Sequence, residues 1–119
     1  MQGRHVAITG PTAGIGRAAA LELARRGASL SLLCRDAAKG RALQAEIAEF
    51  ADQPEVVTID MASLASVRSA AEVMLSKNRP LDVLLNNAGV VNTARRTSAD
   101  GFEETFAVNH LAPFLLTGL

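Results

Sequence analysis

A glycine-rich segment at residues 9–16, Thr-Gly-Pro-Thr-Ala-Gly-Ile-Gly, separates a short apolar run at residues 5–9 from a longer segment of helical period. A strand, a turn of small residues and a helix in this order present backbone N–H groups and a helix N-terminus to an anion. Small side chains also let a phosphate approach the main chain closely. The segment therefore predicts a phosphate-binding turn after a parallel strand, with a plain strand-to-helix turn as the alternative.

The same alternation of apolar runs and helical segments continues along the chain, with runs at residues 30–34, 56–59 and 81–85. This is the pattern of βαβ units. Right-handed crossovers then favour an α/β fold, a Rossmann-type doubly wound parallel sheet in the order 3-2-1-4. With 119 residues, the chain is read as one domain over residues 1–119.

Side-chain spacing predicts which faces are buried. The first helix is expected to bury the stripe Ile15, Ala19, Leu23, and the second the stripe Leu43, Ile47, Phe50. The run at 81–85 is apolar almost throughout, which predicts a strand covered on both faces. In the last helix, Asn109 shares a stripe with Phe102 and Phe106, which predicts an inward-facing amide that needs hydrogen-bond partners.

Composition excludes several classes of function. Twelve Lys and Arg balance twelve Asp and Glu, so no basic excess favours nucleic-acid binding. The single cysteine, Cys34, cannot form an intrachain disulfide, and neither a signal peptide nor a membrane span is visible. We therefore expect a cytoplasmic protein without a metal site, in which His5, His110 and Cys34 are structural.

Four motifs now occur in order along nearly the whole chain: Gly10-x-x-x-Gly14-x-Gly16, Asp60, Asn86-Asn87-Ala88-Gly89 and Asn109. Together they resemble the classical short-chain dehydrogenase/reductase family. The segments Cys34-Arg35-Asp36, Val108-Asn109-His110-Leu111 and Phe114-Leu115-Leu116-Thr117 most resemble its retinol-dehydrogenase-like members. Pro113 departs from that pattern and is a point at which the helix can kink.

The resemblance implies a nicotinamide cofactor and assigns residues to it. The glycine-rich turn would hold the pyrophosphate, through Gly10, Thr12, Ala13, Gly14, Ile15 and Gly16. Asp36 lies 20 residues after Gly16, near the usual place of the ribose-binding carboxylate, and Arg35 before it would bind a 2′-phosphate. This favours NADP over NAD. The alternatives are that Arg35 is merely solvated and that Asp36 only caps a helix.

The remaining positions are assigned in the same way. Asp60 and Met61 resemble the pair that contacts adenine, although Asp60 could also cap the next helix. Asn87, Ala88 and Gly89 would pack against the adenosine side of the cofactor, or form a plain turn. Asn109 resembles the asparagine of the family's Asn-Ser-Tyr-Lys catalytic set, where it helps to hold a water in the proton relay. A satisfied core amide is its alternative.

The family uses a tyrosine as general acid or base, with a lysine four residues later and a serine that steadies the substrate oxygen. This chain contains no tyrosine, and its lysines are Lys39 and Lys77. Four strands also make only part of a doubly wound sheet, and the fourth would lie at an unprotected edge. The expectation is the amino-terminal half of a longer reductase, or a truncated gene product.

Three hypotheses follow. The first is an NADP-dependent oxidoreductase that transfers hydride between the nicotinamide and a small-molecule substrate, a carbonyl or alcohol of unknown size, with homo-oligomerisation of the full-length form left open. The second is a catalytically inactive nucleotide-binding module that pairs with another chain through its sheet edge. The third is a Rossmann-like domain for an adenosyl donor or a sugar nucleotide, against which the glycine spacing and the turn at residues 86–89 argue.

Overall fold

The chain folds around a four-stranded parallel sheet in the order β3-β2-β1-β4, as predicted. The computed structural model describes residues 2–77, 79–88, 100–102 and 107–118. The strands are β1 (His5–Thr9), β2 (Ser29–Cys34), β3 (Glu55–Thr58) and β4 (Val83–Leu85). The helices are α1 (Gly14–Arg25), α2 (Ala37–Ala48), α3 (Leu64–Ser76), the π-helical segment η1 (Ala107–Leu111) and α5 (Ala112–Gly118).

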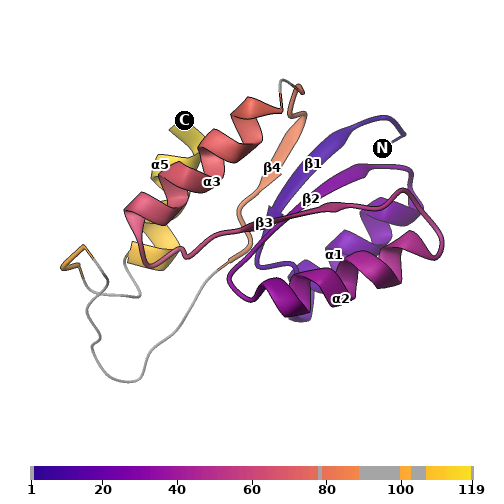
Figure 1. Ribbon diagram of the computed structural model, residues 1–119, viewed down its shortest axis with the longest axis horizontal. Helices are drawn as coiled ribbons and strands as arrows, with labels where there is room; N and C mark the ends of the chain where they lie inside the picture. The colour runs from indigo at the N-terminus through magenta and orange to yellow at the C-terminus, as the bar shows by residue number, and fades with distance from the viewer. Residues whose placement is uncertain (1, 78, 89–99, 103–106, 119) are drawn as a thin grey trace.

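Helices cover both faces of this sheet, with α1 and α2 on one side and α3 and α5 on the other (Figure 1). Because successive side chains of a strand point to opposite faces, β1 contributes to both layers. Val6 and Ile8 belong to the α1/α2 core, and Ala7 belongs to the α3/α5 core. The two apolar layers leave the carboxyl ends of the strands as the place where polar groups can gather.

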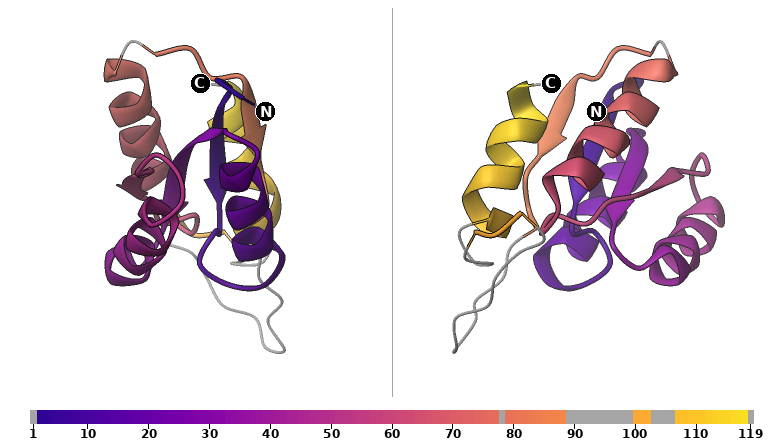
Figure 2. Two further views of the ribbon diagram at one scale, coloured as in Figure 1. Left: turned by 90° about the vertical axis from the view of Figure 1, so that its right-hand side faces the viewer. Right: turned by 60° about the vertical axis from the view of Figure 1, so that its left-hand side comes forward.

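Strand β4 is short and lies at the edge of the sheet, parallel to β1 (Figure 2). Its pairs with β1 are Val6↔Val83, Ala7↔Leu84 and Ile8↔Leu85. Val83 is 41% exposed, so the prediction that this strand is covered on both faces is wrong for its first residue. The edge position explains the exposure, because Val83 has a neighbouring strand on one side only within the described residues.

The buried face of α1 also differs from the prediction. Ile15 is 83% exposed, whereas Gly16, Ala20 and Ala24 are buried against the sheet. The true stripe is shifted by one residue, with Leu21 buried beside it, because α1 starts directly beneath the glycine-rich turn, where Gly16 has no room for a Cβ. In α2, Leu43 and Ile47 are buried as expected, but Phe50 lies beyond the helix end and is exposed beside Arg25.

Side chains define the starts of two helices. The Asp36 carboxylate accepts hydrogen bonds from the N–H groups of Ala38 and Lys39 and so caps α2, a role that the sequence left open beside cofactor binding. Helix α3 is capped by Ser63, whose hydroxyl accepts from Ser66 N. The alternative role of Asp60, as the cap of this helix, does not hold; its carboxylate instead accepts from Ala62 N in the preceding turn.

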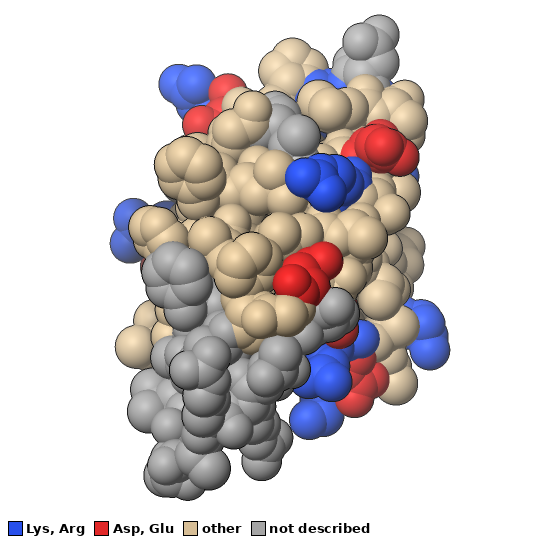
Figure 3. Space-filling view, turned by 90° about the vertical axis from the view of Figure 1, so that its left-hand side faces the viewer, with Lys and Arg blue, Asp and Glu red and all other residues tan. Residues whose placement is uncertain are grey.

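The outer face of the α3/α5 layer carries few charged side chains near its centre (Figure 3). Val73 and Leu75 on α3 and Phe114 on α5 are exposed apolar residues. Within the described parts of the chain, no helix combines the length and the apolar character needed to cross a membrane.

Candidate cofactor-binding site

The turn after β1 is shaped by a close approach of two backbone segments. Gly10 has φ +65°, and a Cβ there would lie 2.9 Å from the Cα of Ala88. Its N–H donates to the carbonyl oxygen of Leu33 at 3.2 Å, which ties the turn to β2. Only glycine combines this left-handed conformation with this contact, so the sequence at position 10 follows from the geometry.

Gly16 lies under the same turn at the start of α1. A Cβ on Gly16 would lie 2.2 Å from the Gly10 carbonyl oxygen and 2.3 Å from Asn87 Nδ2. That amide nitrogen donates to the Gly10 carbonyl oxygen at 3.0 Å. The absent side chain of Gly16 therefore makes room for a hydrogen bond that joins the β1 turn to the segment after β4.

Thr9 holds the same two segments together from the other side. The N–H groups of Asn87 and Ala88 each donate to Thr9 Oγ1 at 3.0 Å. Thr9 is 1% exposed. Removing its hydroxyl oxygen would take the acceptor away from both N–H groups and so reduce the stability of the fold. The carboxyl ends of β1 and β4 are thus fixed to one another by side chains as well as by strand pairing.

A cavity of about 790 Å³ opens at this edge of the sheet, within the size range of cofactor pockets. The residues that line it come from the carboxyl ends of all four strands, from the first turn of α2 and from η1. They are Gly10, Thr12, Leu33, Cys34, Arg35, Asp36, Ala37, Ala38, Lys39, Ile59, Asp60, Met61, Ala62, Ala88 and Val108. Seven of the predicted site residues are among them: Gly10, Thr12, Arg35, Asp36, Asp60, Met61 and Ala88.

The other predicted residues lie around this cavity or outside it. Gly16 and Asn87 support the turn from below, as described above, whereas Ala13, Gly14 and Ile15 are exposed at the start of α1 and do not line the cavity. Gly89 lies outside the described residues. Of the two predicted adenine contacts, Met61 is buried, and the N–H of Asp60 donates to Ser66 Oγ at 2.8 Å.

Two cations flank the capped start of α2. Arg35 and Lys39 are both exposed and both line the cavity. Sequence reasoning identified Arg35 but assigned no role to Lys39. A signal was available, because a lysine in the first turn of a helix faces the positive end of the helix dipole and is unfavourable there unless an anion is present.

Asn109 does not face inward, so that prediction is wrong for the described structure. Its side chain is exposed and lines a separate shallow hollow with Asn86 and Phe114. The reason lies in the neighbouring apolar residues: Val108, Ala112 and Leu116 occupy the buried stripe against α3. Beside Asn109, the amide of Asn86 donates to Thr117 Oγ1 at 3.1 Å.

Cys34 is a buried packing residue, as predicted. Burial raises the pKa of its thiol, the nearby Asp36 carboxylate raises it further, and Arg41 opposes the change. The thiol therefore stays protonated and is a poor nucleophile. Among the described residues, no group of three or more His, Cys, Asp or Glu side chains could hold a metal ion.

The fold and the cavity define a Rossmann-type domain, in which ligands bind where the strand order reverses, here between β1 and β4. Residues 4–119 match the family model described as short chain dehydrogenase. The chain therefore belongs to the short-chain dehydrogenase family of oxidoreductases, and it is retinol-dehydrogenase-like.

Individual relatives support this placement. The chain is 44% identical to Retinol dehydrogenase 12 from Bos taurus over 119 residues, which cover 98% of this chain and 38% of that protein. A metagenomic short-chain oxidoreductase solved in complex with NADP superposes with a TM-score of 0.86 at 32% identity, over 98% of this chain and 54% of the other.

A second solved structure contains NADH. It is that of 3-ketoacyl-(acyl-carrier-protein) reductase from Brucella melitensis, which superposes with a TM-score of 0.80 at 30% identity, over 98% of this chain and 48% of the other. The chain thus spans less than two thirds of the length of each of these three proteins.

Proposed function

We propose that this chain binds NADP(H) as the nucleotide-binding part of an oxidoreductase that acts on a small carbonyl or alcohol substrate. The observation that carries the proposal is the pair of cations, Arg35 and Lys39, at the end of the cavity formed by α2. Relatives with NADP and with NADH both occur, so the preference is argued from the chain's own residues.

The cavity fits a dinucleotide. The turn after β1 and the segment after β4 approach so closely at Gly10 and Ala88 that no side chain fits between them. The main chain is therefore accessible at this edge of the sheet. The turn leads into the N-terminus of α1, where unpaired N–H groups and the helix dipole favour a pyrophosphate. Asp60 and Met61 would meet the adenine at the far side.

The start of α2 favours a phosphorylated ribose over a free one. An enzyme that prefers NAD uses a carboxylate at this point to accept from the ribose hydroxyls. Here Asp36 Oδ1 already accepts from the N–H groups of Ala38 and Lys39, at 3.0 and 3.2 Å. Arg35 can form a bidentate contact with a 2′-phosphate, and Lys39 adds a second charge.

When bound, the nicotinamide would supply or accept the hydride. The residues of this chain bind and orient: Thr9, Gly10 and Asn87 fix the turn, and Arg35 and Lys39 fix the adenosine end. Asn109 stays a predicted catalytic residue. The cytoplasmic location and the homo-oligomerisation of the full-length form also stay predictions.

Calorimetric titration of the protein with NADPH and NADH tests the cofactor preference. We expect Arg35→Ala to weaken NADPH binding by about 1.5–3 kcal/mol, the scale of a hydrogen bond to a charged group, and Lys39→Ala to weaken it by less. Both variants should leave NADH binding almost unchanged. Arg41→Ala is the matched control, since Arg41 is an exposed cation of the same helix outside the cavity lining.

Equal affinity of the native protein for the two nucleotides, unchanged in Arg35→Ala, would refute the preference for NADP. An equal loss in Arg41→Ala would show that only the general positive charge of α2 matters. Raising the salt concentration should weaken NADPH binding more than NADH binding, because the contact at the 2′-phosphate is electrostatic.

A second candidate is a nucleotide-binding module without hydride transfer of its own, which pairs with another chain through the sheet edge at β4, where Val83 is 41% exposed. Turnover by the 119 residues does not separate the two candidates, because the first expects the catalytic tyrosine and lysine to lie outside these residues. Sedimentation and a hydrophobic dye separate them: a monomer that binds no dye counts against the module, and association through β4 supports it.

A further inference from the structure

The turn that joins β3 to α3 forms one wall of the cavity, through residues 60–62. Its main chain is fixed from two sides. Ile59, before the turn, is 2% exposed, and its N–H donates to the carbonyl oxygen of Cys34 at the end of β2, at 3.0 Å. On the other side, the N–H of Asp60 donates to Ser66 Oγ, in the first turn of α3, at 2.8 Å. The main chain at Asp60 is therefore held between β2 and α3.

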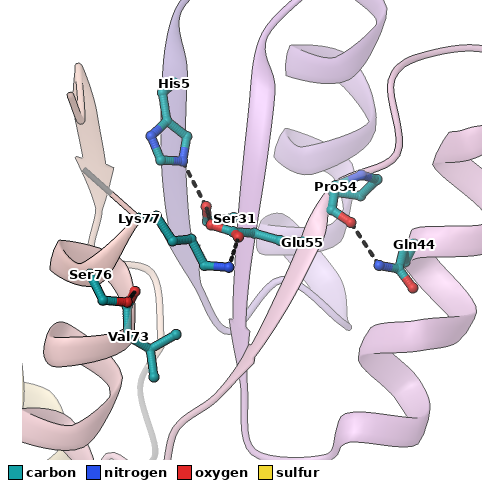
Figure 4. Close-up of polar contacts among 8 residues, drawn as sticks. All are labelled: His5, Ser31, Gln44, Pro54, Glu55, Val73, Ser76 and Lys77. Carbon is teal, nitrogen blue, oxygen red and sulfur yellow. Dashed lines mark hydrogen bonds and ion pairs between the residues drawn. The ribbon is translucent and has the colours of Figure 1, made fainter. Parts of the chain in front are cut away.

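Ser66 does not line the cavity, and the packing of α3 sets its position. The next residue, Val67, is 0% exposed in the core between α3 and the sheet. Directly after the helix, Lys77 Nζ pairs with Glu55 Oε2, at the start of β3, at 2.8 Å (Figure 4). Helix α3 is thus tied to β3 and its following turn at both ends, which makes the Ser66 hydroxyl a fixed acceptor for Asp60.

The hydrogen bonds inside this turn leave one donor and one acceptor for a ligand. The N–H of Ala62 donates to Asp60 Oδ1 at 2.9 Å, and the N–H of Ser63 donates to the Asp60 carbonyl oxygen at 3.0 Å. Among the residues that the structure describes, none accepts from the N–H of Met61 or donates to Asp60 Oδ2. This carboxylate oxygen and this N–H are therefore available to a molecule in the cavity.

An acceptor beside a donor is complementary to the 6-amino group of adenine and a neighbouring ring nitrogen. Hypoxanthine carries a carbonyl oxygen in place of that amino group, and two acceptors would then face one another at Asp60. Hydrogen bonds weaken steeply as their geometry worsens, so the selectivity depends on how the two protein groups are held. Because Ser66 holds the N–H of Asp60, it sets the direction in which the Asp60 side chain leaves the main chain.

We infer that Ser66 is a positioning residue, which holds the Asp60 carboxylate and the Met61 N–H in the arrangement that selects adenine over hypoxanthine. The inference rests on the proposed function, in which Asp60 and Met61 meet the adenine of NADP(H). Ser66 acts through Asp60 and lies outside the cavity lining. Its loss should therefore lower the selectivity for adenine, whereas a residue that only stabilises the fold affects both nucleotides alike.

Calorimetry with NADPH and with its 6-oxo analogue, reduced nicotinamide hypoxanthine dinucleotide phosphate, measures this selectivity as the ratio of the two dissociation constants. We expect the native protein to bind NADPH at least about tenfold more tightly, the scale of one hydrogen bond to a charged group. In Ser66→Ala the ratio should fall to about threefold or less. Ser66→Thr keeps the hydroxyl and should keep the native ratio, while Ser66→Val has nearly the same shape without the hydroxyl and should behave as Ser66→Ala.

Two further variants of this helix and its cap separate selectivity from stability. Ser63→Ala removes the hydroxyl that accepts from Ser66 N at 3.3 Å and caps α3, but it leaves the bond from Asp60 to Ser66 in place. It should lower the midpoint of urea unfolding and leave the ratio at its native value. Ser76→Ala is the matched control, because Ser76 Oγ donates to the Val73 carbonyl oxygen at 2.8 Å, at the other end of α3 (Figure 4). It should leave the ratio unchanged.

A native ratio in Ser66→Ala would overturn the inference, as would equal ratios in Ser66→Thr and Ser66→Val. An equal fall of the ratio in Ser63→Ala would reduce Ser66 to a residue that only stabilises α3. Tight binding of NADPH by the native protein, with no preference over the 6-oxo analogue, would also count against the inference and leave the proposed function intact. If the native protein bound neither nucleotide, the proposed function and the inference would both be refuted.

Discussion

Replacing Thr9 by valine should separate the carboxyl ends of β1 and β4. Valine has nearly the shape of threonine, but it removes the oxygen that accepts from the N–H groups of Asn87 and Ala88. Losing an acceptor from a buried donor costs about 1–3 kcal/mol. Both donors here are only partly buried, so water can replace part of each bond. The expected total for Thr9→Val is about 2–3 kcal/mol.

Urea unfolding measures this loss directly. With a slope of about 1–3 kcal/mol per molar urea, as for other small domains, the midpoint should fall by about 0.7–3 M. Thr9→Ser is the matched control, because it keeps the hydroxyl and loses only one methyl group, which costs about 0.8 kcal/mol. NADPH affinity should follow the same order, with Thr9→Ser above Thr9→Val.

A Thr9→Val variant within about 0.5 kcal/mol of the native protein would refute the reasoning, since surface substitutions alone reach that size. The reasoning would equally fail if Thr9→Ser were as damaging as Thr9→Val. That result would assign the role of Thr9 to its methyl group and to packing, with the hydrogen bonds contributing nothing measurable.

Three further substitutions test other parts of the molecule. Gly16→Ala places a Cβ 2.2 Å from the Gly10 carbonyl oxygen. It should lower the free energy of thermal unfolding by about 2 kcal/mol and abolish NADPH binding, and a variant with native stability and NADPH affinity would contradict this. Asp36→Ala removes the cap of α2 and should cost about 1 kcal/mol in urea unfolding, whereas Asp36→Ser should recover most of the loss. Burial opposes the ionisation of Glu55, but hydrogen bonds from Lys77 and Ser31 outweigh it, so folding lowers the pKa of the Glu55 carboxyl group. Its carboxylate should therefore stabilise the protein above the ordinary pKa of 4.5 and lose that effect as the pH falls. In Glu55→Gln, the free energy of unfolding should therefore fall less steeply as the pH is lowered.

The sheet order and the glycine-rich turn could be predicted because each follows from a local rule. Alternating strands and helices with right-handed crossovers leave few topologies, and Gly10 occupies a position that only glycine tolerates. The cap at Asp36 is equally local. The order of the elements, the run of glycines and the capping residue are all visible in a single sequence, whereas the contact of Gly10 with Ala88 is visible only in the fold.

The features that could not be predicted depend on distant partners. Periodicity favoured Ile15 and Leu23 for the buried face of α1, but the turn above that helix requires Gly16 beneath it, and this places Leu21 and the small residues on the buried face. The prediction that Asn109 faces inward was wrong for the same reason, because the residues that contact α3 are Val108, Ala112 and Leu116. Only the folded chain shows which of two adjacent stripes has a partner.

The two ends of β4 are held by residues that share one face of β1, and this arrangement has a measurable consequence. His5 Nδ1 lies 3.1 Å from the carbonyl oxygen of Pro80, before β4, and the Thr9 hydroxyl accepts from the N–H of Ala88, after it. His5 and Thr9 lie four residues apart, about 13 Å along the strand, so their contacts do not overlap. Independent contacts at that separation should give additive losses within about 0.5 kcal/mol. If β4 moves as one short segment, however, releasing either end already loosens the other. The double variant His5→Gln with Thr9→Val should then cost about 1 kcal/mol less than the sum of the single variants in urea unfolding. Strict additivity would mean that β4 bends between its two fixed ends, and that the amino-terminal edge of the sheet cannot influence the cavity wall at Ala88.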